Sequence, residues 1–338
     1  MTTDLARQLP SRPKQETLTD ALFARWHRAW PELDTTGTLK STPEDFLVVE
    51  QAEHSVRATP AGPHLYLFIE KRDLTTNAVV RLLADGNGLP TSAIGYAGMK
   101  DKFAVTRQWF SVPLEEAPPE VSVPDEVQEL ARLRTTKKLR RGWHSGNSFE
   151  LVLRDVVCSG AQDATACRAL LDARLSAITS NGVPNYFGPQ RFGRDNVPAA
   201  IAWLPRRRKE RNAFRRGLYL SVLRSFLFNE VLSARLAADS VILDGPMWGR
   251  GRVQASQADI EFEQRALAGH ERICTELEFA GLLQERRALT VVPRNLRWDW
   301  HGDATLALWF DLPPGAYATA VLRELGQFQP PDARLSRA

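Results

Sequence analysis

The sequence predicts an α+β fold, because strand-like and helix-like segments alternate without a regular period. Residues 64–71 and 148–156 carry alternating, aromatic or β-branched side chains that are typical of strands. Residues 163–178 and 214–237 place apolar side chains at helical spacing. Residues 239–295 show no clear pattern and lie between better-patterned ends, which indicates an inserted domain.

The N-terminal elements follow from local patterns. Residues 18–30 read as a helix with apolar side chains on one face. The segment 39–50 reads as two strands joined by a proline turn. A helix capped by Thr75 or Thr76 comes after the strand at 64–71, and we expect it to stop near Gly86.

The later elements are separated by a proline-rich and acidic segment at 113–126, which predicts a surface loop. Near the C-terminus, residues 297–300 and 305–312 predict two strands. A Pro-Pro-Gly turn at 313–315 leads into a helix expected over 317–325.

Composition indicates a globular protein with a basic surface. The 338 residues are 43% hydrophobic, enough to bury a core in one large domain or two smaller ones. The net charge is only +4, but basic residues gather at 134–141 and 206–216. Such clusters fit a polyanionic partner, because Lys and Arg neutralise phosphates. A solvated helix face is the alternative for either cluster.

Cysteine usage and hydropathy bear on compartment. Only Cys158, Cys167 and Cys274 are present, widely spaced and without a CxxC pair. This pattern argues against a disulfide framework and is typical of a reducing cytosol. The sequence has no apolar run of membrane-spanning length and no signal-peptide pattern. We therefore expect a cytoplasmic protein that does not bind membranes.

Common enzyme motifs are missing from the sequence. The glycines at 95–98 do not meet the phosphate-loop spacing, and no GxGxxG follows a predicted strand. The six histidines show no HxxxH spacing, and the HxE…PCxxC signature is absent. No GxSxG elbow occurs. Nucleotide cofactors, metal ions and serine hydrolase chemistry consequently lose support.

The stretch 95–110, GYAGMKDKFAVTRQWF, is the strongest candidate site. Asp101 follows a glycine-rich turn and could be a turn former or helix cap. Lys100 and Lys102 would instead favour an ionised carboxylate, as a nucleophile or base requires. Nearby aromatic residues fit RNA, whose unstacked bases lie on aromatic faces. The residues alone predict an acidic group in a candidate RNA-binding enzyme.

This stretch resembles the AGxKDxxAxTxQ signature of the TruD family of transfer RNA pseudouridine synthases. Four further segments agree with the family in order and spacing: KSTPEDFLVVE at 40–50, HSGNSFELVLR at 144–154, GVPNYFGPQRFG at 182–193 and PPGAYATAVLREL at 313–325. Together they span roughly residues 35–326, and the length matches the bacterial form.

The resemblance implies a pseudouridine-synthase catalytic domain with a mixed, largely antiparallel sheet, plus an inserted TruD-specific α+β domain. We expect the catalytic domain at 21–182 and 296–338, the inserted domain at 183–295, and a loose tail at 1–20. It further implies isomerisation of uridine to pseudouridine in tRNA, at position 13, without a cofactor or metal. The glycosidic bond breaks, and the uracil rotates and rejoins the sugar through carbon 5.

The resemblance also implies roles for individual residues. Asp101 matches the catalytic aspartate, which attacks the nucleotide or removes a sugar proton. Phe46 and Phe149 match an aromatic wall for the flipped base, and Tyr317 stands where the family usually has Phe. The other predicted substrate contacts are Lys40, Lys100, Gln108 and Asn147. The residues expected to contact the RNA backbone are Lys137, Lys138, Arg140, Arg141 and Arg191.

Two hypotheses from different classes follow. The first is a monomeric tRNA pseudouridine synthase that uses Asp101. The second is an RNA-binding or RNA-folding protein on the same fold without turnover. The intact Lys100–Asp101 dipeptide, Asn147 and Phe149 favour the enzyme.

Overall fold

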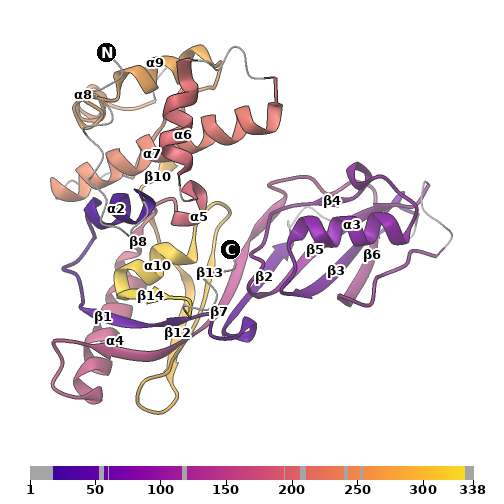
Figure 1. The fold of residues 1–338 in the computed structure, drawn as a ribbon, viewed down its shortest axis with the longest axis horizontal. Coiled ribbons are helices and arrows are strands. Elements are labelled where there is room, and N and C mark those ends of the chain that lie inside the picture. Colours follow the sequence, from indigo (N-terminus) through magenta and orange to yellow (C-terminus); the bar gives the residue numbers. More distant parts are fainter. Residues whose placement is uncertain are drawn as a thin grey trace. The chain divides into compact units, whose positions relative to one another are not determined.

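The computed structural model describes residues 18–52, 57–59, 61–115, 120–193, 195–205, 211–239, 243–251 and 254–331. Its contacts divide the chain into two compact units, which Figure 1 draws as ribbons. Unit 1 comprises Met1–Glu32, Asn181–Val292 and Ala316–Glu324, and unit 2 comprises Leu33–Ser180, Pro293–Gly315 and Leu325–Ala338. Among the helices described, none is long and apolar enough to cross a membrane.

Unit 2 is built on one large sheet. Its strands, in chain order, are β1 Thr35–Leu39, β2 Phe46–Ala52, β3 His64–Arg72, β4 Gly95–Tyr96, β5 Val105–Pro113, β6 Gln128–Thr135, β7 His144–Cys158, β12 Arg294–Trp300, β13 Leu306–Leu312 and β14 Gln327–Gln329. The spatial order is β12-β13-β7-β2-β5-β3-β6, while β1 pairs with β7 and β14, and β4 pairs with β5. The β2–β5 and β1–β14 pairs are parallel and the others antiparallel. The expected mixed, largely antiparallel sheet is confirmed.

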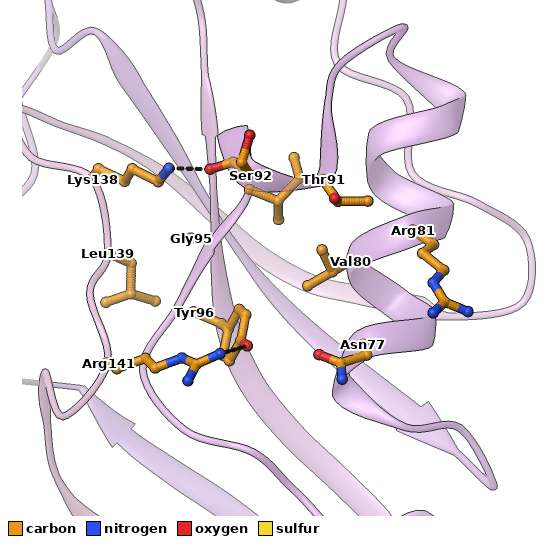
Figure 2. A pocket seen from close by; sticks show the side chains of 11 residues that line it. Asn77, Val80, Arg81, Thr91, Ser92, Gly95, Tyr96, Lys138, Leu139 and Arg141 are labelled. Carbon is orange, nitrogen blue, oxygen red and sulfur yellow. Dashed lines mark hydrogen bonds between the residues drawn. The ribbon is translucent and has the colours of Figure 1, made fainter. Parts of the chain in front are cut away.

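Helix α3, Thr76–Gly86, covers part of this sheet. The Thr75 side chain accepts a hydrogen bond from the Ala78 N–H at 3.1 Å, so the predicted cap is confirmed. The apolar face of α3 packs on β3 and β5, with Leu83 in one cluster with Leu67 and Phe110. Figure 2 shows α3 beside the segment that leads into β4. This helix and segment frame the candidate site.

Helix α4, Ala164–Asn181, follows β7. The structure joins Cys158 of β7 to Cys167 of α4 in a disulfide, with the two Cα atoms 5.4 Å apart. The expectation of unpaired cysteines was therefore wrong for these two. Sequence spacing hid the pair, because the turn between strand and helix reverses the chain and brings both residues together. Cys274 is buried, and burial raises its thiol pKa to about 12.

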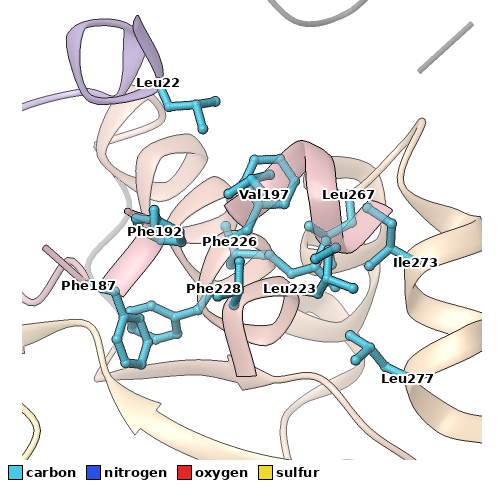
Figure 3. Packing of buried hydrophobic residues seen from close by; sticks show 14 of the residues in the cluster. Leu22, Phe187, Phe192, Val197, Leu223, Phe226, Phe228, Leu267, Ile273 and Leu277 are labelled. Atoms are coloured by element: carbon cyan, nitrogen blue, oxygen red, sulfur yellow. The ribbon is translucent and has the colours of Figure 1, made fainter. Parts of the chain in front are cut away.

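Unit 1 is mainly helical. Its helices are α2 Leu18–Arg25, α5 Pro189–Phe192, α6 Asn196–Trp203, α7 Ala213–Ala237, α8 Gln257–Ala266, α9 Glu271–Phe279 and α10 Ala318–Leu325. Two short antiparallel pairs accompany them: β8 Val183–Pro184 with β11 Thr290–Val291, and β9 Asp244–Met247 with β10 Glu285–Ala288. Figure 3 shows its core, in which Phe226 and Leu223 of α7 lie among Phe192, Val197 and Ile273.

The contact division differs from the expected domain limits in two places. Residues 21–32 and 316–324 group with 181–292 and not with the sheet. The expected helix 18–30 ends at Arg25, five residues early. Three expectations fall partly outside the described residues: the tail up to residue 17, residues 116–119 of the acidic loop, and residues 206–210 of the second basic cluster. The identification of unit 2 as the catalytic domain stays a prediction.

Candidate active site

Asp101 lies on the irregular segment between β4 and β5 in unit 2. Its side chain is 49% exposed, so the carboxylate is open to a ligand. One carboxylate oxygen, Oδ2, accepts a hydrogen bond from the Lys40 ammonium group at 2.7 Å. Lys40 is 61 residues earlier in the chain and only 16% exposed. The ion pair fixes the direction of a carboxylate that would otherwise rotate freely.

Lys40 is itself held in place by the chain around it. It lies just after β1 with φ of 59°, a left-handed conformation that a non-glycine residue adopts only at a cost. Its ammonium group lies 4.0 Å from the centre of the Phe46 ring. Such a cation–π contact stabilises the charge when the side chain is mostly removed from water. Lys40 therefore contacts both Asp101 and the Phe46 ring, and the roles of these residues toward a substrate stay predictions.

A second lysine holds the Asp101 backbone. Lys71, near the end of β3, is 1% exposed and donates to the Asp101 carbonyl oxygen at 2.8 Å and to the Leu74 carbonyl oxygen at 2.6 Å. Burial lowers the pKa of Lys71 to about 8, while the Asp101 charge partly opposes that shift. Two lysines thus hold Asp101, one through its side chain and one through its backbone.

Lys100 does not pair with Asp101. Its ammonium group lies 2.7 Å from Glu50 Oε2, and both side chains are nearly inaccessible, at 6% and 1% exposure. Lys102 extends toward the Phe103 ring, 5.2 Å from its centre. Neither of these two neighbours forms an ion pair with Asp101, and the expectation that they keep it ionised stays a prediction. Adjacent side chains on an irregular segment point in different directions, so sequence neighbours need not be spatial neighbours.

Gln108 is fully buried on β5 and belongs to a network beneath the segment. The Thr76 hydroxyl donates to Gln108 Oε1 at 2.9 Å and accepts from the Lys100 N–H at 2.9 Å. Gln108 Nε2 donates to the Gly98 carbonyl oxygen at 3.0 Å. These bonds satisfy buried polar groups and fix the backbone leading to Asp101. Gln108 supports this backbone and does not reach the open face.

The turn that carries Lys40 is also rigid. Asp45, within the short helix η1 Pro43–Asp45, is buried and accepts from Arg154 at 2.7 and 3.0 Å, one bond to each oxygen. The Thr42 N–H donates to Asp45 Oδ2 at 3.0 Å. A bidentate arginine–carboxylate pair of this kind restricts both partners. Asp45 therefore anchors the turn between Lys40 and Phe46 to β7.

Phe46 and Phe149 pack edge to face, with centres 6.5 Å apart and planes at 79°. Phe149 also stacks on Phe310 at 5.3 Å. Both predicted wall residues are buried, so their packing is that of a core as well. Asn147 lies on β7 opposite Glu50, and its amide oxygen is buried without a hydrogen-bond partner in the part of the chain described.

The predicted backbone-contacting residues of unit 2 are close to the Asp101 segment. Within the described residues, no carboxylate forms an ion pair with Lys137, Lys138, Arg140 or Arg141. The Gly142 N–H donates to the Ala97 carbonyl oxygen at 2.8 Å and ties this basic loop to the segment. Unpaired cations on a fixed loop fit a polyanion better than a solvated helix face.

The remaining predicted residues, Tyr317 and Arg191, belong to unit 1. Arg191 of α5 donates to the hydroxyl oxygens of Ser225 and Ser221. Tyr317 lies 6.0 Å from the Phe187 ring, measured between centres. Sequence reasoning did not identify Arg287, whose guanidinium lies 4.2 Å from the centre of the same ring and whose pKa is lowered by burial to about 10.

Sequence reasoning also missed Lys71, although a signal was present. Leu65, Leu67 and Ile69 alternate along β3 on its buried face, and Lys71 continues that period of two. A lysine in register with a buried apolar row needs internal acceptors. In the structure those acceptors are two backbone carbonyl groups.

One oriented carboxylate beside unpaired basic side chains fits an enzyme that acts on a polyanion. A family model described as tRNA pseudouridine synthase D (TruD) matches residues 27–202. A curated Aeromonas salmonicida protein named tRNA pseudouridine synthase D is 39% identical over 88% of this chain and 92% of its own length. A Cellvibrio japonicus protein of the same name is 39% identical over 91% of this chain and 95% of its own length. The chain belongs to the TruD family.

The fold agrees with that assignment. A solved structure of a Methanosarcina mazei protein, described as a candidate tRNA pseudouridine synthase D (TruD), superposes on this chain with a TM-score of 0.64. The superposition covers 88% of this chain and 95% of the Methanosarcina mazei chain, at 20% sequence identity. Among the described residues, no group of three or more His, Cys, Asp or Glu side chains could hold a metal ion.

Proposed function

We propose that this protein converts uridine to pseudouridine in tRNA, with Asp101 as the catalytic residue. The observation that carries the proposal is the geometry at Asp101. Its carboxylate is half exposed, its oxygen is held 2.7 Å from the Lys40 ammonium group, and its carbonyl is held by Lys71. Asp101 lies in the segment that resembles the family signature, and all three residues lie within the matched range 27–202.

The reaction is an isomerisation, so atoms and electrons balance without a co-reactant. The bond between N1 of uracil and C1′ of the sugar breaks, and a bond between C5 and C1′ forms. The C5 proton leaves to solvent, and N1 gains one proton from solvent. The protein therefore needs one group that attacks the nucleotide or accepts a sugar proton while the base is detached. Asp101 can serve in either route, because both require an oriented carboxylate.

Base recognition is proposed for the polar and aromatic side chains nearby. The target uridine has to leave its stack to reach Asp101. The unpartnered amide oxygen of Asn147 could accept the N3–H of uracil. Phe46 and Phe149 would support the pocket as a packed floor, since both are buried. Tyr317 stays a base-contacting residue predicted by the resemblance.

Three finer proposals accompany the activity. Position 13 is the modified nucleotide that the resemblance implies. The protein works in the cytoplasm, where its tRNA substrate is found, and acts as a monomer. Mapping pseudouridines in tRNA tests the first, cell fractionation the second, and sedimentation of the purified protein the third.

The proposed role of Asp101 is tested with the isosteric variant Asp101→Asn. We expect loss of pseudouridine formation in a single-turnover assay with purified tRNA, while the Kd for tRNA changes less than about threefold. Affinity should persist because phosphate contacts supply most of it. Asp85→Asn on α3 makes the same charge change at an exposed position and should leave both quantities unchanged.

Two outcomes would contradict the proposal. A normal rate of pseudouridine formation by Asp101→Asn would show that Asp101 is not catalytic. Binding of tRNA by the wild-type protein without any pseudouridine formation would favour the second hypothesis, an RNA-binding or RNA-folding protein. The Asp85→Asn variant separates the expected loss of activity in Asp101→Asn from a general effect of lost negative charge.

A further inference from the structure

Unit 2 contains a cavity of about 420 Å³ on the face that carries α3. Figure 2 shows its two walls: α3 and the segment before β4 on one side, and the basic loop on the other. Asn77 and Arg81 come from α3, Tyr96 from β4, and Lys138 and Arg141 from the loop. The cavity is large enough for one nucleotide, since small-ligand sites start near about 300 Å³.

The lining of this cavity is strongly cationic. Arg81, Lys138 and Arg141 line it, and none of its lining residues carries a carboxylate. In the part of the chain that the structure describes, none of the three forms an ion pair, whereas several arginines of the sheet in unit 2 do. Examples are Arg107 with Glu70 and Arg132 with Glu129. Three unpaired cations around one cavity repel each other, so an anion bound between them would be stabilised.

Two of the cations are positioned by neutral partners. Arg141 donates to the Tyr96 hydroxyl at 2.8 Å and its guanidinium lies 5.4 Å from the ring centre. Lys138 donates to the Ser92 carbonyl oxygen, as the dashed lines in Figure 2 mark. An arginine has five N–H donors and a lysine three, so each keeps donors for a ligand. The contacts orient these cations without neutralising them.

The walls of the cavity are fixed to each other. A Cβ atom on Gly95 would lie 2.4 Å from the Leu139 carbonyl oxygen and 2.4 Å from Ser111 Oγ, so only glycine lets the strand approach the loop. The Leu139 N–H donates to the same Ser111 hydroxyl at 3.0 Å. A cavity whose walls are already joined spends little binding free energy on ordering them.

The cavity adjoins the candidate catalytic segment. Tyr96 lies on β4, five residues before Asp101. Asn77 follows Thr76, whose hydroxyl accepts from the backbone N–H of Lys100. A strand of RNA with one nucleotide at Asp101 would therefore bring a neighbouring nucleotide toward these cations.

We propose that this cavity receives one nucleotide of the RNA strand that flanks the target uridine, with its phosphate bound among Arg81, Lys138 and Arg141. The inference rests on the proposed function, because it takes RNA as the substrate. It adds a built subsite with Arg81 on α3, which the basic loop alone did not indicate. The subsite contributes affinity and placement of the strand, and the chemistry stays at Asp101.

The test measures the Kd for tRNA at several salt concentrations for Arg81→Gln and Lys138→Gln. We expect each variant to bind about 3–10-fold more weakly at 0.1 M salt. The slope of log K against log salt should become shallower by about 0.7–0.9, the effect of losing one phosphate contact. Arg132→Gln removes one ion-paired cation of the same sheet and is the matched control.

Several results would overturn the subsite. A salt slope equal to that of the wild type, or to that of Arg132→Gln, would show that no phosphate binds there. Thermal stabilisation by inorganic phosphate that Arg81→Gln abolishes, with tRNA binding unchanged, would assign the cavity to a free anion. Failure of the proposed activity can be told apart from failure of the subsite. If the activity is wrong, no pseudouridine forms, but the Kd for tRNA and its salt dependence can still be measured. A thermal unfolding midpoint within about 2 °C of the wild type confirms that each variant is folded.

Discussion

Lys71→Met tests whether the backbone of the catalytic segment is held by a buried ammonium group. The substitution keeps the size of the side chain and removes the donor to the Asp101 and Leu74 carbonyl oxygens. We expect a loss of about 10–100-fold in the single-turnover rate, because a displaced catalytic group loses its near-attack geometry. Binding of tRNA should change little, since Lys71 is buried.

The stability of the wild type relative to Lys71→Met should depend on pH, because only the wild type carries the Lys71 ammonium group. Burial lowers the pKa of Lys71 from 10.5 to about 8, opposed by Asp101 and Asp73 and assisted by Lys100. A shift of this size costs the folded state about 3 kcal/mol at neutral pH. The unfolded chain binds more protons between pH 8 and 10.5, so the cost disappears as the pH rises through that window. Between pH 7 and 9.5, the free energy of unfolding of the wild type should rise by about 2 kcal/mol relative to that of Lys71→Met.

The assays are single-turnover pseudouridine formation at pH 7 and urea unfolding at pH 7 and 9.5. Lys102→Met is the control, because it removes an exposed lysine next to Asp101 that does not contact it. Its rate should stay within about twofold of the wild type. The reasoning is refuted if Lys71→Met also retains a wild-type rate, or if its stability relative to the wild type does not change with pH.

Two further predictions concern the neighbouring side chains and glycines. Lys40→Met should lower the single-turnover rate by about 100-fold, because it leaves the Asp101 carboxylate free to rotate. The loss of stability should be small, since an ion pair with a half-exposed partner contributes under about 1 kcal/mol. An unchanged rate would contradict the orienting role of Lys40. Gly95→Ala should destabilise the protein by about 1–3 kcal/mol through its clash with Leu139, whereas Gly217→Ala, in open space on α7, should stabilise it by about 0.5–1 kcal/mol. Urea unfolding measures the change in stability of both variants. Equal changes for Gly95→Ala and Gly217→Ala would contradict the proposed clash at Gly95.

Local patterns predicted most elements of unit 2 because its strands and helices follow simple periodicities. The alternation of 148–156 lies within β7, and the Thr75 cap lies where expected. Residues 239–295 could not be ordered, since their short helices and two-stranded pairs are stabilised by contacts far apart in the chain. Arg286, for example, bonds to both Asp244 and Glu263.

The candidate site was predicted in its residues but not in its pairings. Lys40, which the family motifs single out together with Phe46, contacts both Asp101 and the Phe46 ring, although more than fifty residues separate Asp101 from either of them. The ion pair between Lys100 and Glu50 was not foreseen, because the path of the irregular segment between β4 and β5 decides which side chain Lys100 meets. The disulfide was missed for the same reason, since a turn and not sequence spacing joins its cysteines.

The most direct test of the catalytic role of Asp101 is pseudouridine mapping in tRNA from cells that lack this protein. Cells supplied with the wild-type chain should regain pseudouridine at position 13 of their substrate tRNAs. Cells supplied with Asp101→Asn at the same protein level should not regain it, while Asp85→Asn should restore it fully. Restoration by Asp101→Asn would contradict the assignment of the catalytic residue, and no change at any uridine without the protein would contradict the proposed function.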